Sequence, residues 1–232
     1  MAFFSVLDAV VSVGAIVCWF MVASPTDGLS ASALAGIATP AWLLAALAVS
    51  GSHVLYACVW YMPEKFSTAC ASPPLSLLGK SPVTVFAFLV ALAKGLQQLG
   101  LLGFVAATYG NPFSAAMQAS GSTWALAAVL ICLGQTLNAA IYAAIGKDGV
   151  YYGFKLGAPV PWCDGFPFNL GFRHPQYVGG FCSQLGVVAV VSSPAALKAG
   201  LLPLGAWWFF LYSATSLMEA SGDNDGKSSK TA

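Results

Sequence analysis

Charged side chains are scarce in this chain of 232 residues, which has nine Lys and Arg, eight Asp and Glu, and a net charge of +1. They make up 7% of the residues, against about a quarter in soluble globular domains. So few charges cannot cover a surface in contact with water, which excludes a soluble fold. A hydrophobic content of 58% excludes disorder, and the nearly neutral charge argues against nucleic acid as a partner. The composition predicts a membrane protein with several spanning segments.

Motifs for disulfides and metal sites are also missing. The six cysteines include no Cys-x-x-Cys pair, and most of them fall inside apolar runs. They therefore predict neither a disulfide framework nor a zinc site, and we expect the protein to bind no metal.

Long apolar segments separate the few charges, and prolines mark the breaks between the segments. No segment alternates like a barrel strand, and a helix needs roughly 20 apolar residues to cross the hydrocarbon core. We therefore expect an all-α fold, a polytopic bundle of about five to six transmembrane helices. The expected segments are residues 3–23, 41–62, 83–107, 122–146, 176–193 and 197–218.

The chain divides into three expected parts. Residues 1–23 predict a retained N-terminal anchor helix, because they lack the basic start of a signal peptide and contain Asp8. Residues 41–220 form the main membrane domain. Residues 221–232 are polar and predict a disordered tail.

Lysine and arginine residues in the loops predict an orientation. Loops 63–82 and 147–175 and the C-terminal tail hold basic residues, whereas loops 24–40 and 108–121 hold none. With six crossings, all basic loops fall on one side of the membrane. The positive-inside rule predicts that this side, with both termini, faces the cytosol.

Residues 147–173 combine five charges with aromatic residues and prolines, whereas an ordinary loop is rich in Ser, Gly and Lys. This composition favours a folded cap over a site at the membrane surface. An interfacial loop that its aromatic residues anchor is the alternative. Four glycines follow one another at steps of three or four residues: Gly146, Gly149, Gly153 and Gly157. This spacing predicts that they share one helical face, which suits close approach of a backbone or a ligand.

A more specific motif follows. Residues 166–169 read Phe-Pro-Phe-Asn, and residues 173–179 read Arg-His-Pro-Gln-Tyr-Val-Gly at the start of an apolar segment. With the glycine spacing of residues 144–157, these residues resemble the phospholipid methyltransferase family, whose members methylate phosphatidylethanolamine with S-adenosylmethionine. The resemblance covers roughly residues 50–220. It implies this cofactor, a cytosolic cofactor-binding cap, a phospholipid substrate in the membrane and the endoplasmic reticulum as location.

The resemblance also implies which residues bind the cofactor. Besides the Arg-His-Pro motif, the family has a Gly-x-Gly element, which reads Cys-Leu-Gly here, and a Glu-Glu pair, which reads Glu-Ala here. One glycine and one glutamate are thus replaced in this chain. The expected cofactor-binding residues are Cys132, Leu133, Gly134, Arg173, His174, Pro175, Tyr177, Gly179, Glu219 and Ala220.

Topology favours Glu219 independently of the resemblance. The last two apolar segments form a hairpin that turns at residues 192–194, so Glu219 returns to the side of His174 and Tyr177. Methyl transfer needs a neutral amine, and an ammonium comparable to that of lysine is mostly protonated at neutral pH. The expected catalytic residues are therefore Glu219 and His174, with Asp164 as a third candidate base.

Aromatic and basic side chains of the same region suit the remaining tasks. Arg173 is expected to bind the lipid phosphate or the cofactor carboxylate. Ring faces attract cations, so four aromatic residues are expected to hold the sulfonium: Tyr151, Tyr152, Trp162 and Tyr177.

Two other functions remain open from the sequence. An isoprenylcysteine carboxyl methyltransferase-like enzyme is compatible with Arg173 and His174, although the Phe-Pro-Phe-Asn motif favours the phospholipid branch. A small transporter would use Lys94, Gln97 and Gln98 along a path, but the matched broken halves typical of transporters are not visible. The sequence assigns neither the methylation step nor an oligomeric state.

Overall fold

The computed structural model describes residues 5–23, 29–161 and 163–228, with side chains described up to residue 221. The described residues form helices and no strand, which confirms the predicted all-α fold. The α-helices are α1 (Val6–Ala23), α2 (Ala31–Gly36), α3 (Pro40–Tyr61), α4 (Pro63–Cys70), α5 (Pro82–Tyr109), α6 (Pro112–Met117), α7 (Gly121–Val150), α8 (Pro175–Val190), α9 (Pro194–Lys198) and α10 (Leu201–Ser228).

Five helices within the described residues are long and apolar enough to cross a membrane, namely α1, α3, α5, α7 and α10. Each of them matches one expected segment. The sixth segment, residues 176–193, corresponds to α8, which has 16 residues and is about 24 Å long. Most residues of α8 are buried, because the helix packs against α1, α7 and α10. A helix enclosed in this way does not have to match the thickness of the lipid.

Several helices begin where a polar residue precedes a proline. Thr39, Ser81 and Ser193 each accept a hydrogen bond from a backbone N–H in the first turn of α3, α5 and α9, respectively. A proline follows each of these caps, and its missing N–H is not needed at the first helical position. The prolines that interrupt the apolar runs in the sequence therefore define helix starts.

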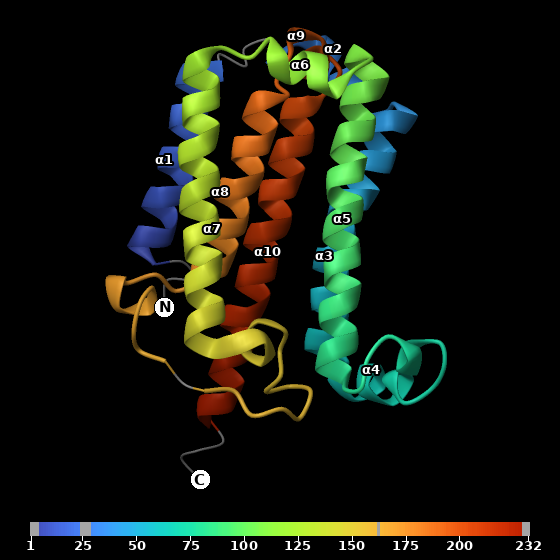
Figure 1. Cartoon of the computed structure of the whole chain (residues 1–232), viewed down its shortest axis with the longest axis vertical. Coiled ribbons are helices and arrows are strands. Elements are labelled where there is room, and N and C mark those ends of the chain that lie inside the picture. The colour runs from blue at the N-terminus through green and yellow to red at the C-terminus, as the bar shows by residue number, and fades with distance from the viewer. Residues whose placement is uncertain (1–4, 24–28, 162, 229–232) are drawn as a thin grey trace.

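Two groups of helices lie on either side of α10 (Figure 1). Helices α1, α7 and α8 form one group and α3 and α5 the other, and α10 contacts both α8 and α3. Polar side chains inside the bundle join the second group to α10 and to the first group. His53 Nδ1 lies 2.9 Å from Thr215 Oγ1, and Gln98 donates to Gln184 at 2.8 Å. Such pairs are favoured where water cannot satisfy a polar group.

Basic residues gather at one end of the bundle. Helix α4, segments 151–161 and 163–174 and the end of α10 lie at this end, and α2, α6 and α9 lie at the other (Figure 1). The basic residues of loops 63–82 and 147–175 predict that these loops share one side of the membrane. We call the first end the basic end, and its basic residues include Lys65, Lys80, Lys147, Lys155 and Arg173.

The four glycines between residues 146 and 157 do not share a helical face, so this prediction is wrong. Gly146 has φ 67° and ψ 179°, a conformation that favours glycine and kinks α7. Helix α7 ends at Val150, and Gly153 and Gly157 lie in the turns that follow it. The kink directs the last turn of α7 across the basic end (Figure 1).

Helix α10 extends further than the sequence predicts. It continues to Ser228, whereas residues 221–232 were expected to be a disordered tail. Propagation of an existing helix adds a hydrogen bond for each residue, so a long apolar helix extends into polar sequence. The remainder of the expected tail, residues 229–232, lies outside the described residues.

Gly134 brings α7 and α8 into close contact. A Cβ atom at residue 134 would lie 2.3 Å from the carbonyl oxygen of Gly179 and 2.2 Å from Oγ of Ser183. We expect Gly134→Val to lower the free energy of unfolding by about 1–3 kcal/mol, because the backbone of α8 cannot yield without separating the helices. Thermal unfolding in detergent measures the effect. The control is Gly103→Val on α5, where a Cβ meets no atom within 4 Å, and equal stability of the two variants would contradict the prediction.

Candidate active site

The carboxylate of Glu219, in α10, is held by two tyrosine hydroxyls. Tyr152 follows the end of α7 and Tyr177 lies in the first turn of α8, and both donate a hydrogen bond to Oε1 of Glu219. Three separate segments of the chain therefore meet at one oxygen atom. The proximity of Glu219 to Tyr177, which the hairpin predicts, is confirmed. We call these three residues the Tyr–Glu–Tyr cluster.

Local backbone geometry directs Tyr152 into the bundle. After the kink at Gly146, Tyr152 adopts φ 55°, and its side chain is only 4% exposed. Its ring packs against Tyr56 and Trp60 of α3, with centroids 5.2 Å apart in both pairs. Burial, and then the negative charge of Glu219, raise the pKa of Tyr152 well above its ordinary value. Tyr152 therefore keeps its proton and remains a hydrogen-bond donor.

A pocket of about 220 Å³ lies beside the cluster, and we call it the polar pocket. Its lining combines a carboxylate, a guanidinium, an imidazole and an amide with several aromatic rings. Apolar residues of α7 complete the wall. The polar and aromatic lining residues are Trp60, Tyr152, Phe154, Phe168, Arg173, His174, Gln176, Tyr177 and Glu219.

The ring of Trp60 binds a cation in this structure. Nζ of Lys155 lies 4.0 Å from the centroid of the Trp60 ring, a distance typical of a cation–π interaction. Trp60 also stands at the end of α3, where an aromatic residue can anchor a helix at the membrane interface. Its position in the wall of the polar pocket gives it a second task, since an aromatic face there can hold a positive charge.

Half of the expected cofactor-binding residues come together and half do not. The polar pocket includes Arg173, His174, Pro175, Tyr177 and Glu219. It does not include five others from the same prediction, Cys132, Leu133, Gly134, Gly179 and Ala220. Asp164 is also absent from its described lining, and Trp162 lies outside the described residues.

Helix packing explains the position of the Cys-Leu-Gly segment. Cys132 and Leu133 are exposed on the outside of α7, whereas Gly134 is buried against Gly179 and Ser183 of α8. Gly134 is also about 18 Å along the helix from the kink at Gly146. Gly134 and Gly179 therefore allow α7 and α8 to approach each other, at a distance from the polar pocket.

Asp8, in the first turn of α1, contacts the motif that begins α8. Its carboxylate accepts hydrogen bonds from the backbone N–H groups of Arg173, at 3.2 Å, and of His174, at 3.3 Å. Asp8 is 1% exposed, and Ser5 and Asp8 also bond each other's backbone N–H at 3.0 Å. Sequence reasoning assigned Asp8 no role in the site. An acidic residue within an apolar segment is nevertheless a signal that could have pointed to it.

Sequence comparisons with known proteins match much of this chain. Residues 122–219 match the profile of the phospholipid methyltransferase family, so that the matched region ends at the glutamate of the cluster. A phosphatidyl-N-methylethanolamine N-methyltransferase of Arabidopsis thaliana is 30% identical over 149 residues, which are 64% of this chain and 79% of that protein. This chain belongs to the phospholipid methyltransferase family. No solved structure matches this methyltransferase.

Membership of the family confirms the resemblance and the predicted enzyme class, a phospholipid N-methyltransferase. It decides against the transporter alternative. Gln97 and Gln98, which that alternative assigned to a path, instead bond to residues of α3 and α8, respectively. The five candidate spans agree with an integral membrane enzyme whose substrate is a phospholipid.

The contact of Asp8 with the Arg-His-Pro motif can be tested without an activity assay. In Asp8→Ala, the backbone N–H groups of Arg173 and His174 lose their acceptor. We expect amide hydrogen exchange of a peptide spanning residues 172–177 to accelerate by about tenfold or more. The matched control is Ser5→Ala, which removes the helix cap but not the contact. Equal exchange in wild type and Asp8→Ala would contradict the role that we assign to Asp8.

Proposed function

We propose that this methyltransferase transfers the methyl group of S-adenosylmethionine to the amine of phosphatidylethanolamine or of its monomethyl and dimethyl forms, toward phosphatidylcholine. The observation that carries the proposal is the Tyr–Glu–Tyr cluster in the wall of the polar pocket, at one end of a membrane bundle. The Arabidopsis relative supports it, because the name of that protein specifies a methylated ethanolamine lipid.

The residue types of the polar pocket fit S-adenosylmethionine. When bound, this cofactor supplies a methyl group on a positively charged sulfur atom. The rings of Trp60 and Phe154 would hold the positive charge, just as Trp60 holds the ammonium of Lys155. Arg173 is exposed at the pocket and would bind the carboxylate of the cofactor or the phosphate of the lipid. His174, Pro175 and Tyr177 would complete this site.

Glu219 is the proposed general base. The ammonium of the lipid must lose a proton before its nitrogen has a lone pair for the methyl carbon. The Glu219 carboxylate would attract the ammonium and take up that proton, which leaves a lone pair on nitrogen for the methyl group that the bound cofactor would supply. Tyr152 and Tyr177 orient the carboxylate through Oε1. His174 lines the same pocket and is the second candidate base.

The basic end supports an orientation for the enzyme. Positively charged loops are retained in the cytosol, and here they share an end with the polar pocket. The pocket would therefore face the cytosol, in the endoplasmic reticulum membrane that the resemblance implies. A lipid amine at this surface can reach the cluster while the acyl chains stay in the bilayer.

Replacing the carboxylate tests the proposal most directly. Purified enzyme in phospholipid vesicles is given labelled S-adenosylmethionine, and mono-, di- and trimethylated head groups are separated. We expect Glu219→Gln to lower kcat/KM for the lipid by about 100-fold or more, because the amide cannot take up a proton. Glu64→Gln is the matched control, since Glu64 is exposed on α4 at the same end.

The same assay separates the alternatives. His174→Gln is expected to keep more activity than Glu219→Gln, and the reverse order would make His174 the base. A prenylated cysteine replaces the lipid in a parallel reaction. Methylation of that substrate in preference to phosphatidylethanolamine would overturn the proposed function.

The raised pKa of Tyr152 predicts a pH dependence. A hydroxyl with a pKa far above the usual value of about 10 stays protonated at every pH of the assay. Tyr152→Phe should therefore lower kcat/KM by about tenfold at all pH values, through loss of one charged hydrogen bond. The alkaline limb of the profile should keep its position. A shift of that limb in Tyr152→Phe would show that Tyr152 titrates within the range.

A further inference from the structure

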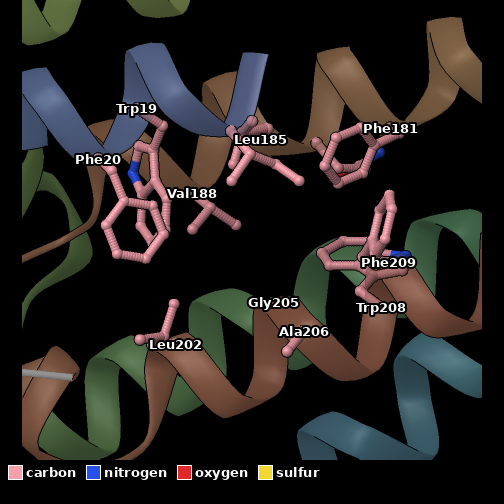
Figure 2. Close-up of a pocket in the computed structure, with 12 residues that line it drawn as sticks. Trp19, Phe20, Phe181, Leu185, Val188, Leu202, Gly205, Ala206, Trp208 and Phe209 are labelled. Atoms are coloured by element: carbon pink, nitrogen blue, oxygen red, sulfur yellow. The ribbon is translucent and has the colours of Figure 1, made fainter. Parts of the chain in front are cut away.

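A second pocket, of about 290 Å³, lies between α1, α8 and α10 and opens at the surface of the bundle, where Phe20 and Ala206 are exposed. We call it the apolar pocket. Figure 2 shows α8 and α10 as opposite walls, with Trp19 and Phe20 of α1 at one end and Phe181 and Phe209 at the other. Its polar side chain, Gln184, accepts a hydrogen bond from Gln98 of α5 at 2.8 Å. The lining is otherwise apolar or aromatic.

The apolar pocket continues a helical face that begins at the polar pocket. Tyr177 lines the polar pocket, and Phe181, Leu185 and Val188 of the same helix line the apolar pocket. Steps of four, four and three residues place these side chains on one face of α8. The rings of Phe181 and Phe209, with centroids 4.8 Å apart, stand at the end of the apolar pocket that is nearer to Tyr177.

The depth of the apolar pocket matches one leaflet of a bilayer. At 1.5 Å per residue, Phe181 lies about 6 Å and Val188 about 16 Å from Tyr177 along α8. Half of the hydrocarbon core is about 15 Å thick. A molecule with its polar group at Glu219 and its apolar part along this face would therefore reach the middle of the membrane.

We propose that the apolar pocket binds an acyl chain of the phospholipid whose amine occupies the polar pocket. This inference rests on the proposed function and names the part of the lipid that positions the amine. A chain that moves from the bilayer into the pocket exchanges one apolar environment for another, so burial there adds little affinity. The pocket instead holds the head group in register with Glu219. The lipid would lie along α8 with its amine at the basic end.

Gly205 provides a substitution that fills the pocket. It lines the apolar pocket, and a Cβ atom built on it meets no other atom within 4 Å. Gly205→Phe therefore adds a ring at the pocket from a position where the new Cβ displaces no atom. The matched control is Gly103→Phe, because Gly103 of α5 is exposed and equally open but does not line the pocket.

The test compares two lipids, dioleoyl phosphatidylethanolamine in detergent micelles and the short-chain dihexanoyl form. We expect Gly205→Phe to lower kcat/KM for the dioleoyl lipid by about tenfold or more, since an acyl chain that cannot enter the pocket leaves the amine out of register with Glu219. The dihexanoyl lipid should react as with wild type, and Gly103→Phe should alter neither rate. Unchanged rates for the dioleoyl lipid, or an equal loss with both lipids, would overturn the acyl-chain site.

A second measurement needs no turnover. Wild-type enzyme is irradiated with phosphatidylethanolamine that carries a diazirine midway along one acyl chain, and the labelled peptides are sequenced. Labels within residues 181–188 or 202–209 support the proposal, whereas labels confined to the outer face of α5, such as Leu99, overturn it. If wild type methylates neither lipid, the proposed function fails, and the cross-link still reports on the pocket.

Discussion

One oxygen atom of the Glu219 carboxylate accepts hydrogen bonds from two tyrosines that lie far apart in the chain. A charge that leaves water is stable only where donors replace the lost hydration. The segment after α7, the first turn of α8 and α10 therefore cannot shift relative to one another without breaking these hydrogen bonds to a partly buried carboxylate. The kink at Gly146 and the burial of Tyr152 place the tyrosine hydroxyl beside this carboxylate.

A second carboxylate, that of Asp8, holds the backbone that leads into α8. The first N–H groups of a helix have no partner within the helix, and the chain must satisfy them elsewhere. Asp8 does this for the residues just before and at the start of α8, so that Arg173 and His174 stand at the polar pocket on a fixed backbone. Glu219 accepts hydrogen bonds from two tyrosine side chains at the pocket, and Asp8 accepts them from main-chain N–H groups outside it.

Local features of the sequence predict the helices well, because apolar length and proline position are properties of short segments. The hairpin also predicts that Glu219 returns to Tyr177, since two antiparallel helices bring their outer ends together. The conformation of Gly146 could not be predicted, because glycines at steps of three or four suit a helical face and a series of turns equally. The Cys-Leu-Gly segment carries the same ambiguity, since a small residue favours contact with a helix as much as with a ligand. The role of Asp8 could not be predicted either, because it depends on which helix packs beside α8, and this is a tertiary property.

The site unites residue 8 with residue 219, so nearly the whole chain separates its two carboxylates. During biosynthesis, helices enter the membrane in order from the N-terminus, so α10 enters after α1 to α9. A nascent chain that has inserted α1 to α8 already has Tyr152, Tyr177 and the support from Asp8, but it lacks the carboxylate to which both tyrosines donate. Insertion of α10 therefore completes the Tyr–Glu–Tyr cluster, and the polar pocket gains its acidic wall only at that step.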